Sequence, residues 1–308
     1  MTTMRIRDVE LFVELVGSGP PLVLMHGGPG ADHWTLNQFR QLADEFTLVF
    51  YDHRSNGRSY GPPVESMTWE NLAADADALR ERLGFEQWAV LGHSFGGTVA
   101  LEYALRYPAR VSQLILLDTG GDAWWPRHNA AELLDRRGYS PKIVRLVRRF
   151  FNGQIAPSRA QSSMFRFGTA YFHRRGLPLV WVLARDLVHG EWRSVFRGEP
   201  LVFAGRHLFP GWSVMDRLGE IQAPTLVIAG RDDFLFPPEH QAQLAAGIPD
   251  ARLEIVERAG HNPHSEEPAV VMERVRSFLA TSAGVAPIPV HSPASAASPS
   301  ERECAQVG

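Results

Sequence analysis

The segment 92–96, Gly-His-Ser-Phe-Gly, constrains the fold of this 308-residue chain more than any other segment. An apolar run at residues 88–91 precedes it, and apolar residues at helical spacing follow it over residues 97–107. A strand that enters a helix through one tight turn leaves the turn residue strained, and glycines two positions to either side leave room for that turn. We therefore expect the hydroxyl of Ser94 to stand exposed beside a helix N-terminus, where it can act as a nucleophile.

Apolar runs typical of strands recur along the chain, with helical patterns between several of them. The runs are residues 9–16, 22–25, 47–51, 88–91, 114–117, 225–229 and 252–256. One of the helical patterns covers residues 69–83 and begins after Thr68, which can cap it. This alternation predicts an α/β protein whose central sheet is mostly parallel, with helices on both faces.

The alternation stops between residues 121 and 212, which have helical patterns without apolar strands between them. Five tryptophans lie in this segment: Trp124, Trp125, Trp181, Trp192 and Trp212. We interpret residues 121–212 as a helical cap inserted into a core made of residues 1–120 and 213–280, because so many tryptophans favour a packed element. An irregular surface excursion is the alternative. Residues 281–308 are rich in Ala, Pro and Ser, which predicts a disordered tail.

Composition argues against several classes of partner. The formal net charge is −3, so there is no electrostatic reason to expect nucleic acid or a membrane surface. Cys304 is the only cysteine, which excludes an intrachain disulfide. The first ten residues contain no apolar signal region, and no window reaches membrane-spanning length. We expect a cytoplasmic protein whose partner is a small molecule or short peptide, and the oligomeric state stays open.

A serine hydroxyl needs a base within hydrogen-bond reach and an acid that orients the base. In an open parallel sheet, both should lie on loops after later strands. Asp232 and Asp233 follow the run 225–229, and we take Asp233 as the acid and Asp232 as the alternative, which could instead bond turn amides. His261 follows the run that ends at residue 256 and is the expected base, with His264 as the alternative.

The negative charge that develops on a substrate oxygen needs preorganised N–H donors. The backbone amide of Phe95 is one candidate. The other is Gly28, in the segment His-Gly-Gly-Pro-Gly of residues 26–30, because glycine lets a backbone amide approach a ligand closely. This loop lacks the Lys-Ser/Thr ending of a P-loop and the spacing of a dinucleotide fingerprint. The histidines show no metal-ligand spacing within a helix, so we predict neither a metal nor a cofactor.

Taken together, these residues resemble the α/β-hydrolase superfamily over roughly residues 6–279. The resemblance implies the α/β-hydrolase fold with an inserted helical cap, and a triad of Ser94, Asp233 and His261. Within the superfamily, segments 26–30 and 51–59 are similar to the proline iminopeptidase group, which removes an N-terminal proline from peptides or proline amides. That group usually has glutamine and glycine at positions 53 and 55, and Gly-Gly-Ser-Trp-Gly at the turn; this chain departs from it at all three places.

The peptidase resemblance implies cap carboxylates that hold the free ammonium group of the substrate. The candidates are Asp186, Glu191 and Glu199, and the candidates for an apolar wall are Trp125 and Trp181.

We predict a serine hydrolase and, as its first interpretation, an aminopeptidase or amidase of the proline iminopeptidase type; the other functions are alternatives. An aminopeptidase or amidase needs an anionic spot in the cap, whereas a carboxylesterase or lactonase keeps the same triad and acts on a small acyl ester. A non-catalytic receptor for a small ligand would have a damaged triad, which this sequence does not show. A lyase or haloperoxidase-like activity on the same triad is a further alternative, because fold and triad do not fix the reaction.

Overall fold

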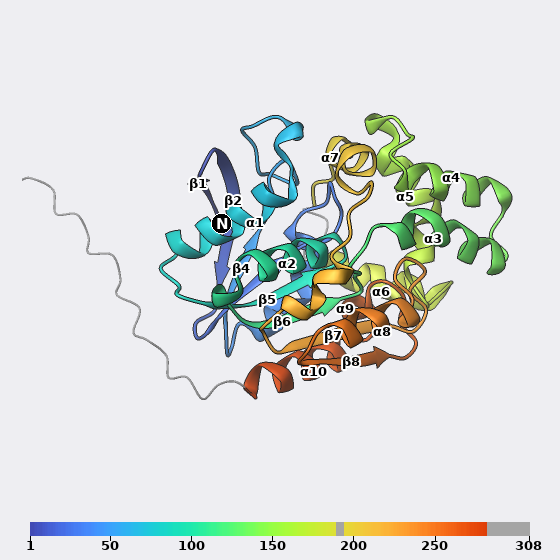
Figure 1. The fold of residues 1–308 in the computed structure, drawn as a ribbon. Helices are drawn as coiled ribbons and strands as arrows, with labels where there is room; N and C mark the ends of the chain where they lie inside the picture. Colours follow the sequence, from blue (N-terminus) through green and yellow to red (C-terminus); the bar gives the residue numbers. More distant parts are fainter. Residues whose placement is uncertain (189–193, 282–308) are drawn as a thin grey trace, which may run out of the picture.

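The computed structural model describes residues 1–188 and 194–281, and an eight-stranded sheet lies at its centre (Figure 1). The strand order is β1-β2-β4-β3-β5-β6-β7-β8. β1 pairs with β2 and β2 with β4 antiparallel, and all other pairs are parallel. The strands are β1 (Thr2–Ile6), β2 (Val9–Val16), β3 (Pro21–Met25), β4 (Thr47–Tyr51), β5 (Trp88–His93), β6 (Val111–Leu117), β7 (Thr225–Gly230) and β8 (Ala251–Val256).

The structure confirms the predicted mostly parallel sheet, and each predicted apolar run lies within a strand. The sequence analysis missed β1, whose residues are mostly exposed and so lack an apolar run. The central strands are buried on both faces, as parallel strands under helices must be. In β5, Val90 belongs to one core cluster, whereas Ala89 and Leu91 belong to the other.

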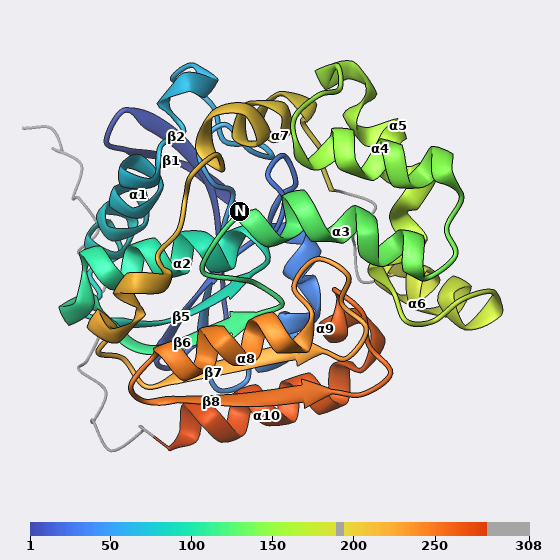
Figure 2. The ribbon, with the colours of Figure 1, turned by 45° about the vertical axis from the view of Figure 1, so that its right-hand side comes forward.

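Helices cover both faces of the sheet (Figures 1 and 2). One face packs against α1 (Trp69–Arg82), α2 (Phe95–Arg106) and α8 (Pro238–Gly247). The other packs against the 3-10 segment η1 (His33–Leu42) and α10 (Pro268–Ala280). The hydroxyl of Thr68 accepts the amide of Asn71 at 3.2 Å, so the predicted cap begins α1.

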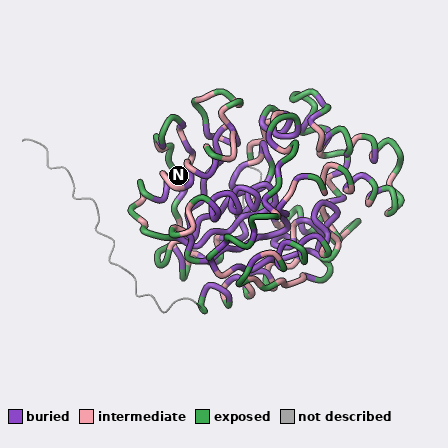
Figure 3. Tube along the Cα trace, in the orientation of Figure 1, coloured by how far each residue is buried: buried purple, intermediate pink, exposed green. Residues whose placement is uncertain are grey.

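Among the described residues between β6 and β7, five α-helices lie beside the carboxyl ends of the strands, where the sequence predicts a cap (Figure 2). They are α3 (Trp124–Arg136), α4 (Pro141–Phe151), α5 (Ala160–Phe167), α6 (Leu177–Val188) and α7 (Gly198–Phe203). In α4, Val144, Val147 and Phe150 are buried at helical spacing, while the arginines between them stay exposed. These apolar residues join a third core cluster that includes Phe234, which follows β7, so the cap packs onto the core. Figure 3 shows that buried positions concentrate in the middle of the molecule.

The predicted tail lies outside the described residues, apart from Thr281 after the end of α10. In the part of the chain that is described, no helix combines the length and the apolar character needed to span a membrane.

The N-terminus of α2 approaches β3 so closely that only glycine fits. A Cβ atom at Gly96 would lie 1.9 Å from the carbonyl oxygen of Met25, and one at Gly92 would lie 2.4 Å from the carbonyl oxygen of Gly96. Backbone atoms cannot move aside as a flexible side chain can. The two glycines of the motif therefore set the position of Ser94 against the sheet.

We expect Gly96→Ala to lower the free energy of unfolding by at least about 2 kcal/mol, because the new methyl group overlaps a backbone oxygen. Urea denaturation measures this change. The matched control is Gly219→Ala, because nothing lies within 4 Å of its Cβ position. The control should stay within about 0.5 kcal/mol of the parent. Equal losses in the two variants would show that the close contact does not matter.

Candidate active site

Three side chains from distant parts of the chain form a hydrogen-bonded series. Ser94 lies in the turn from β5 to α2, and Asp233 and His261 follow β7 and β8. Nε2 of His261 is 2.9 Å from Oγ of Ser94, and Nδ1 of His261 is 2.9 Å from Oδ2 of Asp233. A carboxylate can only accept from Nδ1–H, which leaves Nε2 free to take the serine proton. The structure thus brings the three predicted residues together in the order that acyl transfer needs.

The backbone holds Ser94 in a strained conformation, with φ of 53° and ψ of −120°. The amide of Ser94 donates to the carbonyl oxygen of Leu117 at 3.0 Å, and the carbonyl oxygen of Ser94 accepts Oγ1 of Thr119 at 2.7 Å. Such a conformation persists only where the surroundings enforce it. The strain places the hydroxyl at the edge of a cavity, although Ser94 is only 8% exposed.

The alternative acid and base occupy other environments. Oδ2 of Asp232 is 2.6 Å from Nδ1 of His173 at a partly exposed position, while Asp233 is fully buried and accepts the amide of Leu235 at 2.8 Å. Nε2 of His264 donates to the carbonyl oxygen of Thr35 at 3.1 Å, and burial lowers the pKa of His264 to about 4. Asp233 rather than Asp232 is therefore beside His261.

The predicted oxyanion donors lie beside the nucleophile. Gly27, Gly28 and Phe95 line the same cavity as Ser94, and a Cβ atom at Gly27 would lie 3.4 Å from Cβ of Ser94. Gly28 has a φ of 132°, which favours glycine. Phe95 is the first residue of α2, so its N–H lacks a partner within the helix. Their role as donors stays a prediction.

Two residues that the sequence analysis missed tie the cap to His261 and its loop. The carbonyl oxygen of Tyr171 accepts the amide of His261 at 2.7 Å. The carboxylate of Glu266 accepts three backbone amides, from Gly260 at 2.6 Å, His173 at 3.1 Å and Arg174 at 2.9 Å. Apart from the bond of Gly260 to Glu266, these bonds join segments about 90 residues apart, so no local pattern in the sequence indicates them.

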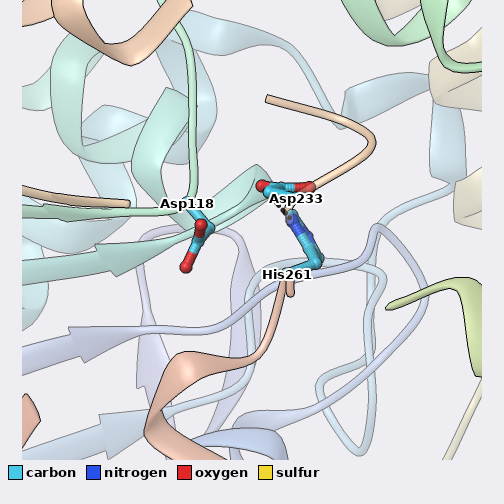
Figure 4. A group of neighbouring side chains, drawn as sticks. All are labelled: Asp118, Asp233 and His261. Carbon is cyan, nitrogen blue, oxygen red and sulfur yellow. Dashed lines mark hydrogen bonds and ion pairs between the residues drawn. The ribbon is translucent and has the colours of Figure 1, made fainter. Parts of the chain in front are cut away.

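A second carboxyl group lies next to the triad. Asp118 follows β6 and is fully buried, and one of its oxygens lies within 4.8 Å of ligand atoms of both Asp233 and His261 (Figure 4). Its Oδ1 accepts the amide of Gly230 at 2.8 Å and Nε2 of Gln241 at 3.3 Å. Burial, together with the neighbouring carboxylate of Asp233, raises the pKa of Asp118 well above its usual range.

The raised pKa favours the protonated form of Asp118 in the folded state. The three groups are close enough to surround a cation, but Asp233 and His261 already bond to each other.

A signal for Asp118 was present in the sequence, because it directly follows the run 114–117. The sequence analysis did not use it.

A cavity of about 420 Å³ opens beside Ser94 between the core and the cap. Most of its wall is apolar. Phenylalanines from the cap and one tryptophan contribute much of this surface: Phe151, Phe165, Phe172, Phe196, Phe209 and Trp212. Among the described residues, Asp122 and Arg127 are the only Asp, Glu, Lys or Arg side chains that line it.

Of the five predicted cap residues, four are among the described residues, and none of these four lines the cavity. Asp186 is buried elsewhere, where Oδ1 accepts Nε2 of Gln38 at 2.9 Å, and Glu199 is exposed at the start of α7. Trp181 is 77% exposed on the outside of α6, and Trp125 stacks on His240.

Glu191 and Trp192 lie outside the described residues. Of the other four tryptophans in the cap segment, Trp212 alone lines the cavity. Composition indicates that a cap is packed, but the neighbours of each helix decide which side chains face inward.

A family model described as the alpha/beta hydrolase fold matches residues 20–268, so this chain belongs to the α/β-hydrolase fold family. It is 31% identical over 263 residues to a protein of Agrobacterium fabrum that bears the provisional name carbamate hydrolase RutD, with 84% of this chain and 93% of the relative covered. It is 28% identical to the 2-hydroxy-6-oxo-6-phenylhexa-2,4-dienoate hydrolase of Comamonas testosteroni, with 83% and 86% covered. Among solved structures, proline iminopeptidase of Mycobacterium smegmatis is similar, with a TM-score of 0.70, 26% identity, and 91% and 98% of the two chains covered. The chain is thus an α/β hydrolase, as the sequence predicts.

We expect Asp233→Asn to lower the turnover of an activated ester by about 10³- to 10⁴-fold, because the amide favours the wrong tautomer of His261. Steady-state rates on p-nitrophenyl butyrate measure the effect. Asp232→Asn is the matched control and should retain most of the activity. A nearly active Asp233→Asn beside an inactive Asp232→Asn would reverse the assignment of the acid.

We expect the free energy of unfolding of Asp118→Asn, minus that of the parent, to increase as pH rises from 5 to 8. Between the ordinary pKa of aspartate and the raised pKa of Asp118, the folded state keeps a proton that the unfolded state releases, so this group lowers the free energy of unfolding as pH rises. Asparagine carries no such proton and can still accept the amide of Gly230. Urea denaturation at both pH values tests this. The control is Asp216→Asn, at an exposed position. If the difference in free energy of unfolding between Asp118→Asn and the parent does not change with pH, the raised pKa of Asp118 is contradicted.

Proposed function

We propose that this chain is a serine hydrolase that cleaves small carboxylic esters with an apolar body, through an acyl-enzyme on Ser94. The observation that carries this proposal is the apolar cavity of about 420 Å³ that opens at the hydroxyl of Ser94. A cavity of this size accommodates a small acyl ester, and its wall offers aromatic contacts.

The triad supplies each proton transfer of this reaction. His261 takes the proton of Ser94 as Oγ attacks the ester carbonyl, and Asp233 stabilises the imidazolium that forms. The amides of Gly28 and Phe95 would hold the oxyanion. His261 then gives its proton to the departing alcohol and activates a water molecule, which releases the acid and restores Ser94.

The charges around the cavity favour an ester over a peptide with a free N-terminus. An ammonium group needs a free carboxylate, but Oδ1 of Asp122 already accepts the amides of Trp124 at 2.8 Å and Trp125 at 3.1 Å. Arg127 lines the same cavity and repels a cation. Asp186, the buried carboxyl of the cap, does not line it.

A second candidate is an aminopeptidase of the proline iminopeptidase type. Two observations favour it: Asp122 lines the cavity, and a relative 27% identical over 288 residues is the proline iminopeptidase PfmaB of Pestalotiopsis fici. In that case the second oxygen of Asp122 would bind the ammonium group of the substrate.

The test compares hydrolysis of p-nitrophenyl butyrate and proline β-naphthylamide by the parent and by Ser94→Ala. We expect the ester to be cleaved at least tenfold faster. Ser94→Ala should lose at least about 10³-fold in rate while its melting temperature stays unchanged, because the hydroxyl is needed only for the chemistry.

Faster cleavage of the proline amide, dependent on Ser94, would replace the ester proposal by the aminopeptidase. Absence of turnover on both substrates would contradict both proposals and favour a receptor. Activity that persists in Ser94→Ala would exclude Ser94 as the nucleophile.

A further inference from the structure

Arg127 is the one arginine or lysine among the described residues that line the cavity. It extends from α3, and its Nη2 donates to Oδ1 of Asn152 at 2.9 Å. Its Nη1 is buried and has no hydrogen-bond partner among the described residues, and no carboxylate of those residues lies within 4 Å of the guanidinium. Burial alone lowers the pKa of Arg127 below its usual value.

The same chain shows how a buried arginine is ordinarily satisfied. Arg54 is fully buried, and its guanidinium donates to Asp75 at 2.6 and 2.7 Å and to Asp8 at 2.9 Å. A desolvated cation without such a partner costs free energy. Arg127 is only partly buried, so it bears a smaller cost, at the wall of the active-site cavity, where a bound ligand can supply the missing anion.

A neighbouring side chain restrains the guanidinium of Arg127. Asn152 holds Nη2, and its own Nδ2 donates to the carbonyl oxygen of Arg148 at 2.8 Å, so the amide cannot turn away without losing a bond. Asp122, the other charged group of the wall, forms no ion pair with Arg127 and lies 3.8 Å from Nε2 of His240. The guanidinium is therefore held by a hydrogen bond to Asn152, and no carboxylate of the described residues neutralises its charge.

We propose that Arg127 forms a carboxylate subsite, so that the preferred substrate is an ester with an apolar body and a carboxylate remote from the scissile bond. A carboxylate fits better than a phosphate, because a single guanidinium in an apolar wall matches one negative charge and offers few donors. This inference rests on the proposed function and specifies its substrate class.

The first test measures binding and does not depend on turnover. Isothermal titration calorimetry compares 4-phenylbutyrate with the neutral 4-phenylbutyramide, on the parent and on Arg127→Met at pH 7.5. We expect the parent to prefer the carboxylate. Arg127→Met should lose about 10- to 100-fold of the carboxylate affinity and keep its amide affinity within about 3-fold, because only the charged hydrogen bond is removed.

Two controls separate the subsite from cap stability. Arg145→Met removes an exposed arginine of α4 that does not line the cavity and should leave both affinities unchanged. Arg127→Lys keeps the charge, so it should retain part of the preference even if Arg127→Met weakens the cap. A parent that does not prefer the carboxylate, or equal losses of both ligands in Arg127→Met, would overturn the subsite.

A kinetic arm relates the subsite to the reaction. Arg127→Met should raise KM for mono-p-nitrophenyl succinate about tenfold or more, with little change in kcat and little change on p-nitrophenyl butyrate. A preference for the carboxylate in binding without any ester turnover would retain the subsite and reject the proposed function. If both esters are turned over and Arg127→Met changes their KM values equally, the proposed function is retained and the subsite is rejected.

Discussion

The contact between Gly96 and the carbonyl oxygen of Met25 is the constraint on which the site depends. It brings the first turn of α2 against β3 at a distance that no side chain permits. Ser94 is consequently held at a φ of 53°, with its hydroxyl at the edge of the cavity and the amide of Phe95 at the helix start. The same approach puts the glycine loop after β3 next to the nucleophile. One backbone contact thus positions both the expected nucleophile and the expected oxyanion donors.

Strand order supplies the remaining groups. Because β6, β7 and β8 are neighbours and parallel, the residues after their carboxyl ends meet at one edge of the sheet. Asp118, Asp233 and His261 come together there, although up to 143 positions separate them along the chain. Two carboxyl groups so close cannot both be charged in a buried site. Burial and the neighbouring carboxylate of Asp233 raise the pKa of Asp118, and it is Asp233 that lies 2.9 Å from Nδ1 of His261.

The cap determines what the site can accept. It packs on the core through a cluster that includes Phe150, Phe167 and Phe234, and Tyr171 accepts a hydrogen bond from the backbone of His261. Cap residues and the catalytic loop are therefore positioned together. The cap gives the cavity an apolar wall and a guanidinium without a carboxylate partner among the described residues, and these two properties argue for a substrate different from an N-terminal proline.

The sequence by itself determined the class of fold, most strands of the sheet, and the serine, acid and histidine that the structure brings together. It could do so because strand period, tight-turn glycines and the residue just after a strand are local features. It did not determine which cap residues line the cavity: Trp125, Trp181 and Asp186 do not, and Arg127, which does, was missed. It also left Asp118 and Glu266 unassigned. Only the tertiary structure decided these points, because the inward face of a helix and the partner of a buried charge depend on neighbours far away in the chain.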